Sequence, residues 1–164
     1  MKNKQSEIKN ELTKTSAKVY WACPVSTNSR YRLIDGFCYY FEATAMNYST
    51  AETNCKNKFG PLYKGKLLEP RSVSLNNKIY KNAQEVLNPG GAYEYWIGVT
   101  DRRTEGRHSY NSDVGDANVN LGIWLSGEPN NIGTAGDGDC ILLQSSKWFD
   151  SSCTRQETSV CEIE

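Results

Sequence analysis

The sequence predicts an α+β domain in which two helices flank small antiparallel sheets and a long polar loop stands apart. Two stretches have the apolar spacing of helices, and they alternate with short β-prone runs. Six cysteines occur without any C-x-x-C pair, which favours disulfides over a metal cluster. Residues 111–139 form a run of 29 residues, of which 15 are Gly, Asn or Asp. Such a stretch is long for a compact domain and needs something to order it.

Length and charge exclude several classes of protein. The chain has 164 residues, which is typical of one domain. Its 19 basic and 19 acidic side chains balance, so we expect no nucleic-acid partner bound by phosphate neutralisation. A mean hydropathy of -0.65 and the lack of a long apolar run predict no membrane span in this chain. An aromatic share of 11% is too high for a disordered chain.

The cysteines indicate the compartment. His108 is the only histidine, so a zinc site would need unusual ligands. Six thiols without metal spacing favour three disulfides, made in an oxidising, extracellular setting. Spacing alone leaves 15 connectivities open. The alternative is a cytosolic protein with six buried, reduced thiols. The cysteines are at positions 23, 38, 55, 140, 153 and 161.

Residues 1–22 are expected to form a tail or a short stalk. Ile8, Leu12 and Val19 fall at heptad spacing, but two weak heptads do not predict a coiled coil. Residues 1–20 lack the apolar segment of a signal peptide, so we expect a secreted mature form or an ectodomain. The sequon that begins at Asn47 could carry a glycan, as in a glycoprotein.

The first half of the domain is predicted to hold a hairpin and two helices. Residues 37–41 are aromatic and β-prone, and Asp35-Gly36 before them signals a turn. A helix follows around residues 48–55, with Ser49 or Thr50 as its cap. Residues 66–69 read as a short strand that Pro70 stops. Residues 74–87 read as the second helix, closed by residues 88–91.

The second half is predicted to be strands around the polar loop. Residues 95–99 have the composition of a buried strand, and residues 140–144 and 160–163 look like two more. Residues 147–150 lie between these last two. Trp124 is among the few large apolar side chains in the long loop.

Oxygen-bearing side chains are dense in and around this loop. Carboxylates so close together repel one another without a cation, and calcium takes six to eight oxygen ligands. The alternative is a solvated loop whose acids serve solubility. An EF-hand is rejected, because Leu121 stands where that loop needs Gly and Gly127 stands where it needs an acid. The oxygen-bearing residues are Asp101, Glu105, Asp113, Asp116, Asn118, Asn120, Glu128, Asn130, Asn131, Asp137, Asp139 and Asp150.

Several short motifs give the chain a family resemblance. Because these motifs occur in the order typical of the family and the six cysteines are in register with them, residues 23–164 resemble a C-type lectin-like domain of the long form. Secreted invertebrate C-type lectins and collectin carbohydrate-recognition domains are examples of this family. The resemblance implies the C-type lectin fold and the disulfides Cys23–Cys38, Cys55–Cys161 and Cys140–Cys153. The motifs are Cys23-Pro24, Cys38-Tyr39, the helix with Tyr48, Ala51 and Cys55, Gly65-Lys66-Leu67-Leu68, Trp96-Ile97-Gly98-Val99, Gly127-Glu128-Pro129-Asn130, Cys140, Trp148-Phe149-Asp150, Cys153 and Val160-Cys161-Glu162.

Glu128-Pro129-Asn130 carries the functional part of the resemblance. In the family this tripeptide, usually with a cis proline, marks sites for mannose, N-acetylglucosamine or fucose. A bound calcium ion there coordinates two vicinal sugar hydroxyls. The resemblance implies that both calcium and sugar are bound by Glu128, Asn130, Asp137 and Asp150.

Phe149 departs from the family pattern. The family has Asn at this position, which binds both calcium and sugar, whereas Phe offers neither an oxygen nor an N–H group. Sugar affinity is therefore expected to be weakened or lost. The alternative function is a protein-interaction domain in which Phe149 is an exposed apolar contact with a protein ligand.

A second, auxiliary calcium site is implied by residues 100–106, which resemble the corresponding segment of collectin-type domains. Its ligands would be Asp101, Glu105, Asn131 and Asp139, so one or two Ca²⁺ ions are expected. The alternative is that Asp101 is a turn residue and Glu105 pairs with Arg107.

The resemblance as a whole implies a calcium-dependent lectin in recognition or innate immunity. Its partners would be glycans or glycoproteins, and oligomers are possible. An enzyme is not expected, because His108 has no nearby nucleophile in a Ser/His/Asp pattern. Glu128 with Asp137 or Asp150 could imitate a glycosidase pair, but calcium ligation explains these acids better.

Overall fold

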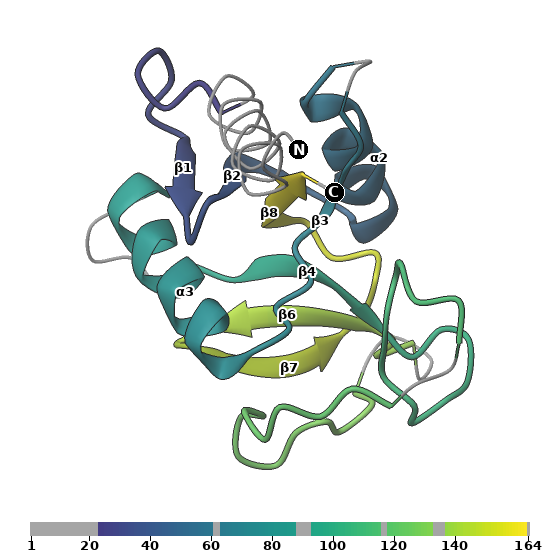
Figure 1. The fold of residues 1–164 in the computed structure, drawn as a ribbon. Coiled ribbons are helices and arrows are strands. Elements are labelled where there is room, and N and C mark those ends of the chain that lie inside the picture. Colours follow the sequence, from purple (N-terminus) through teal and green to yellow (C-terminus); the bar gives the residue numbers. More distant parts are fainter. Residues whose placement is uncertain (1–22, 61–62, 88–92, 116–117, 133–136, 164) are drawn as a thin grey trace, which may run out of the picture.

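An eight-stranded sheet with two helices beside it forms the described part of the chain (Figure 1). The structure is a computed structural model, and it describes residues 23–60, 63–87, 93–115, 118–132 and 137–163. The predicted tail, residues 1–22, and the predicted closure of the second helix, residues 88–91, lie outside these ranges. In chain order the elements are β1 (Tyr31–Ile34), β2 (Phe37–Met46), α2 (Tyr48–Lys58), β3 (Gly65–Leu67), α3 (Val73–Leu87), β4 (Tyr95–Thr100), β5 (Ser109–Tyr110), β6 (Cys140–Gln144), β7 (Lys147–Ser151) and β8 (Glu157–Ile163).

The sheet consists of two antiparallel groups joined at one place. Its strand order is β1-β2-β8-β4-β6-β7, with β3 added beside β8 and β5 beside β4. All pairs are antiparallel except β4 with β8, which are parallel. Figure 1 shows α2 beside the β2–β8 group and α3 on the other side of the molecule. The predicted α+β class with two helices and small antiparallel sheets is confirmed.

The first hairpin and helix form largely as the residues predict. Asp35 and Gly36 have φ values of 52° and 84°, as a tight two-residue hairpin turn requires. The predicted helix caps are wrong, because Asn47 is the N-cap of α2. Asn47 is extended, and its Oδ1 accepts a hydrogen bond of 2.9 Å from Thr50 N. Ser49 and Thr50 lie inside the first turn.

A buried polar contact fixes α3 against the sheet. Asn76 is fully buried on the inner face of α3 with Ile79 and Ala83. Its Oδ1 accepts from Trp148 Nε1 at 2.9 Å, and its Nδ2 donates to Ser146 O at 3.0 Å. These bonds satisfy an otherwise costly buried amide and hold β7 in place beneath the helix.

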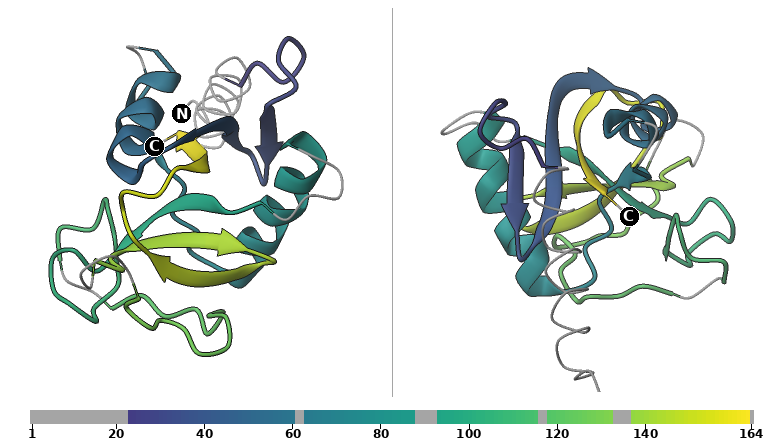
Figure 2. Two further views of the ribbon diagram at one scale, coloured as in Figure 1. Left: turned by 180° about the vertical axis from the view of Figure 1, so that it is seen from behind. Right: turned by 45° about the horizontal axis from the view of Figure 1, so that its top comes forward.

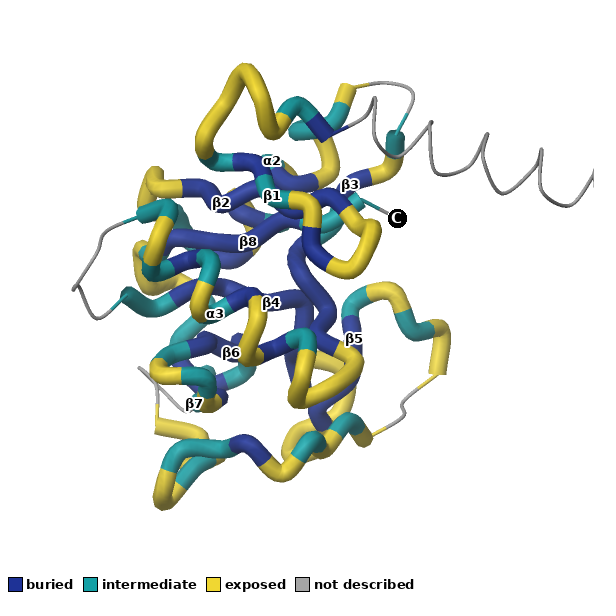
Figure 3. Tube along the Cα trace, turned by 60° about the vertical axis from the view of Figure 1, so that its left-hand side comes forward, coloured by how far each residue is buried: buried dark blue, intermediate teal, exposed yellow. Residues whose placement is uncertain are grey.

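Two apolar clusters form the core, and Figure 3 shows the central strands as buried. The larger contains Ile79, Ile97 and Trp148, and the second contains Tyr48 and Trp96. Tyr48 and Trp96 pack edge to face with ring centroids 5.4 Å apart. The second cluster also contains most of the half-cystines.

All three implied disulfides are present: Cys23–Cys38, Cys55–Cys161 and Cys140–Cys153. The first links the segment before β1 to β2. The second joins α2 to β8 across a separation of 106 residues. The third links the start of β6 to the segment after β7.

The long polar loop is irregular where it is described, and few apolar side chains anchor it. Ile123 is buried, and Trp124 packs edge-on against Trp148 at 5.7 Å. Backbone bonds Leu125 N to Trp148 O and Trp148 N to Ile123 O tie this part of the loop to β7. Within the described ranges, the helices are too short or too polar to cross a membrane.

Candidate functional site

The candidate residues gather at one end of the sheet because three strands end or begin there. Thr100 at the end of β4 pairs with Cys140, and Cys140 pairs with Ser151 at the end of β7. Asp101, Asp139 and Asp150 are therefore brought together from distant parts of the sequence. The loops around this end lie away from the β1–β2 hairpin (Figure 2).

The Glu128 turn presents a carboxylate and an amide side by side. The peptide bond between Glu128 and Pro129 is cis, as the resemblance implied. Asn130 Nδ2 donates to Glu128 Oε1 at 2.7 Å, and Asn130 Oδ1 accepts from Ile132 N at 2.8 Å. The turn is thus closed by its own side chains.

Asp150 fastens this turn to the sheet. It is buried in β7, and its Oδ1 accepts from the backbone N–H of Asn130 at 2.9 Å. Its Oδ2 accepts from the backbone N–H of Asn131. One carboxylate therefore satisfies two loop amides, and charge-assisted bonds of this kind are among the stronger ones in proteins.

Glu128 has an unusual environment for an acid. Burial raises the pKa of its carboxyl group to about 7, and the neighbouring Asp150 carboxylate adds to the effect. Its Oε2 is buried and has no hydrogen-bond partner. Such an oxygen is costly to bury unless a proton or a cation accompanies it.

The auxiliary residues lie next to this turn and share Asn131 with it. Asn131 Nδ2 donates to Glu105 Oε1 at 2.8 Å, while its backbone N–H reaches Asp150. Asp101 is buried; its Oδ2 accepts from Gly106 N at 2.9 Å and its Oδ1 has no partner. Asp101 N donates to Asp139 O at 3.2 Å.

Asp137 and Asp139 complete the acidic group. Burial, and then the charges of Asp101 and Asp137, raise the pKa of Asp139. Ser152 Oγ donates to Asp137 Oδ2 at 2.9 Å, and Asp137 Oδ1 is buried without a partner. Gly138 between them allows close approach, since a Cβ atom there would lie 3.0 Å from Asn131 Cα.

These side chains supply oxygen atoms that suit a hard cation. Among the described residues, buried side-chain oxygens without a partner include those of Asp101, Glu128 and Asp137. Oxygen donors without thiolate or free imidazole fit Ca²⁺ better than Zn²⁺. The same residues contain no group of three or more His, Cys, Asp or Glu side chains placed to hold a metal ion. Two of the acids are instead paired with amides, Glu128 with Asn130 and Glu105 with Asn131.

Phe149 lies between two buried neighbours in β7, Trp148 and Asp150. Its ring is half-buried and packs against the second core cluster. The side chain therefore contributes to the fold, and it is less exposed than the protein-interaction alternative supposed.

Two nearby residues received no binding role from the sequence. Ser152 holds the carboxylate of Asp137. His108 is buried, its ring packs edge-on against Trp124 at 4.7 Å, and its Nε2 lies 3.7 Å from Asp101 Oδ2. For His108, the sequence offered one signal, which is its position two residues after the 100–106 segment.

Comparisons with known proteins cover most of the chain. The family model of the lectin C-type domain matches residues 44–163. The hepatic lectin of Gallus gallus is 28% identical over 160 residues, which are 96% of this chain and 69% of that protein.

Two solved structures share the architecture. The mouse scavenger receptor C-type lectin carbohydrate-recognition domain superposes with a TM-score of 0.69 at 24% identity, over 84% of this chain and 97% of that one. The cow C-type carbohydrate-recognition domain of CD23, solved in the presence of a GlcNAc2Man3 oligosaccharide, gives 0.64 at 25% identity, over 82% and 93%.

Proposed function

The chain belongs to the C-type lectin domain family, and from this premise we propose that it binds mannose, N-acetylglucosamine or fucose-type glycans in a calcium-dependent manner. The observation that carries the proposal is the Glu128-Pro129-Asn130 turn, fastened to Asp150. Support also comes from a hepatic lectin relative and from the cow domain solved with a mannose-containing oligosaccharide.

The primary ion would be held by Glu128, Asn130 and Asp150, with Asp137 as a further acid. Asp101, Glu105, Asn131 and Asp139 would hold an auxiliary ion. The buried, unpartnered oxygens of Asp101, Glu128 and Asp137 support this assignment. Calcium supplies, when bound, coordination positions for two vicinal hydroxyl groups of the sugar.

Glu128 and Asn130 would select the sugar. A hydroxyl group both donates and accepts, so it can bridge a carboxylate oxygen and an amide N–H group that lie side by side. Asn130 Nδ2 and Glu128 Oε1 are 2.7 Å apart and form such a pair. The order of acceptor and donor around the site suits one arrangement of vicinal hydroxyls, which gives stereochemical selectivity.

The wider role proposed is extracellular recognition, including innate defence. Three disulfides fit an oxidising compartment. We propose residues 23–164 as the recognition domain, residues 1–22 as a tail or stalk, and Asn47 as a glycan acceptor. Binding of a ligand without turnover is proposed, and the partners are glycoproteins rather than nucleic acids. Oligomerisation would raise the avidity of single weak sites.

A glycan array in millimolar calcium, with and without EDTA, tests this function. We expect binding to mannose-type glycans that EDTA abolishes. The Glu128→Gln variant should lose calcium and glycan affinity, while the exposed helix variant Glu85→Gln should match the wild type. The proposal is overturned if no glycan binds in calcium, or if Glu128→Gln still binds glycans in EDTA.

Phe149 favours a second candidate, a protein-interaction domain that has kept the fold and lost sugar binding. The missing Asn side chain removes one calcium ligand and one sugar hydrogen bond, worth about 1.5–3 kcal/mol. In that case a protein ligand would be captured equally well with EDTA or free mannose present. Loss of capture in EDTA would exclude this candidate.

A further inference from the structure

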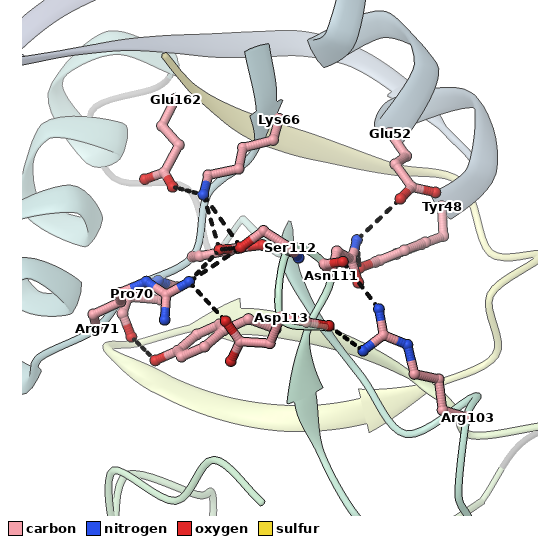
Figure 4. Close-up of polar contacts among 12 residues, drawn as sticks. Tyr48, Glu52, Lys66, Pro70, Arg71, Arg103, Asn111, Ser112, Asp113 and Glu162 are labelled. Atoms are coloured by element: carbon pink, nitrogen blue, oxygen red, sulfur yellow. Dashed lines mark hydrogen bonds and ion pairs between the residues drawn. The ribbon is translucent and has the colours of Figure 1, made fainter. Parts of the chain in front are cut away.

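Arg103 ties the auxiliary calcium loop to residues 111–113, which follow β5 (Ser109–Tyr110). It stands between Asp101 and Glu105, in the loop that follows β4. Its guanidinium group donates to Asp113 O at 2.5 Å and to Asn111 O at 3.1 Å (Figure 4). The acceptors are backbone carbonyls, so the bonds fix the path of one loop against that of another.

The segment that receives Arg103 rests on a buried carboxylate, Glu69. The Glu69 side chain is 0% exposed. Ser112 donates to it twice, from its backbone N at 2.8 Å and from its Oγ at 2.5 Å. Lys66 and Arg71 donate to the same carboxylate at 3.0 and 2.8 Å. A buried charge with this many donors is costly to move, because any displacement leaves it under-satisfied.

Further side chains hold the segment on both sides of Ser112. Arg71 also donates to the Asp113 carboxylate at 3.2 Å, and Tyr110 OH donates to Pro70 O at 2.6 Å. Asn111 Nδ2 donates to Tyr48 OH at 2.9 Å (Figure 4). Residues 110–113 therefore form a firm support for Arg103.

We propose that Arg103, supported by Glu69 through Ser112, is a positioning residue for the auxiliary calcium site. This inference rests on the calcium binding in the proposed function. A loop held in one conformation before the ion arrives loses less entropy on binding it. Outer partners that orient metal ligands are typically worth 10–100-fold in affinity.

Arg102 provides a matched control in the adjacent position. Its guanidinium lies over the Tyr48 ring at 4.9 Å and 3.8 Å from the Glu52 carboxylate, so it contacts side chains of α2. Removing either arginine takes a positive charge from the neighbourhood of a cation, which by itself strengthens calcium binding. Weaker binding in Arg103→Met alone would therefore isolate positioning from charge.

The test is hydrogen exchange of residues 101–106 in the full chain during a calcium titration. For Arg103→Met we expect the midpoint of calcium-induced protection to rise about 10-fold. For Arg102→Met we expect the wild-type midpoint or a lower one. In EDTA, the segment should exchange faster in Arg103→Met than in Arg102→Met. Ser112→Ala keeps the backbone bond to Glu69 and should give a smaller shift in the same direction.

The outcomes separate this inference from the proposed function. Equal midpoints for Arg103→Met and Arg102→Met overturn the inference, and so does a wild type whose residues 101–106 gain no protection in calcium. Calcium-dependent glycan binding in the same samples would leave the proposed function standing. A shifted midpoint without any glycan binding would support the positioning role and overturn the sugar function.

Discussion

The two halves of the molecule are held together by different forces. The β1–β2–α2–β8 half is tied by Cys23–Cys38 and Cys55–Cys161 and by an apolar cluster around Tyr48. The loops at the end of β4 and β7 are mostly exposed, and side-chain bonds to backbone groups order them, such as those of Asp150. The first half should therefore be indifferent to ions, while the order of the second should depend on charge, pH and bound cations.

Removal of the Cys55–Cys161 disulfide should have the largest effect and should act on the covalently tied half. In the chain-entropy model a link across this separation of 106 residues stabilises by up to about 4.7 kcal/mol. Cys55→Ala with Cys161→Ala should lose a similar free energy of unfolding in calcium and in EDTA, measured with denaturant. The Cys140–Cys153 pair closes a shorter loop and should cost less. If the double variant lost stability only in EDTA, the contrast between an ion-independent half and ion-dependent loops would be wrong.

Glu162 should make the stability of the same half depend on pH. Burial raises its pKa to about 7, the Glu69 charge adds to this, and Lys66 opposes it. Because the folded pKa is above the unfolded value, this group contributes stability below about pH 4.5 that is lost as pH rises towards about 7. Between pH 4.5 and 8 the wild type should lose up to about 3 kcal/mol of its free energy of unfolding through this group, and Glu162→Gln should not show this loss.

The measurement for Glu162 is denaturant unfolding of both proteins across this pH range. Glu85→Gln, on the exposed face of α3, serves as the control. Parallel stability curves for wild type and Glu162→Gln would show that Glu162 does not titrate as described.

Phe149→Asn replaces an apolar side chain that packs on the core with an amide that could bind the calcium ion at the primary site. Restoring the family's side chain should raise calcium and mannose affinity together by about 10- to 150-fold, equivalent to about 1.5–3 kcal/mol. It should lower stability in EDTA, since the ring packs against the second cluster. Calorimetry with calcium and mannose, beside unfolding in EDTA, gives both quantities. Unchanged affinities would mean that the sugar site lies elsewhere.

Glu128 should make calcium binding depend on pH in the loop half. With a pKa raised to about 7, its carboxyl group is largely protonated below that pH, and a proton competes with the cation. Calcium affinity should fall by up to about 10-fold for each pH unit below 7. Calorimetry between pH 8 and 6 measures this fall, which Glu128→Gln should not show. A flat profile for the wild type would refute the role of Glu128.

Local patterns predicted the fold well because short motifs and cysteines carry it. The strand and helix patterns led to most of the elements, although they missed the short strand β5. The three disulfides followed from the family resemblance, because spacing alone left 15 connectivities open. The helix cap was misplaced because Asn47, Ser49 and Thr50 all have the chemistry of a cap, and only the extended backbone of Asn47 decides among them. The roles of the eight candidate ligands remain predictions, although the structure brings several of them into contact.

The contacts missed by the sequence are those between residues far apart in the chain. Glu69 and Ser112 are separated by 43 residues, and neither belongs to a recognisable motif. The sequence predicted Glu69 only as the last residue of a short strand. Its role as a buried acceptor becomes evident in the structure, where Lys66, Arg71 and Ser112 all donate to it. The same holds for Ser152, whose role depends on where the loop places Asp137.

Asn131, a candidate ligand of the auxiliary group, is hydrogen-bonded to one residue of each group, and this has a thermodynamic consequence. Its amide reaches Glu105 and its backbone N–H reaches Asp150. Binding of an ion to either ligand group would fix the position of Asn131, and this also orders its bond to the other group. The binding of the two ions should therefore be cooperative. Reciprocity then requires each ion to raise the affinity of the other by the same factor. The loops would gain or lose their ions as one unit, over a narrow interval of calcium concentration.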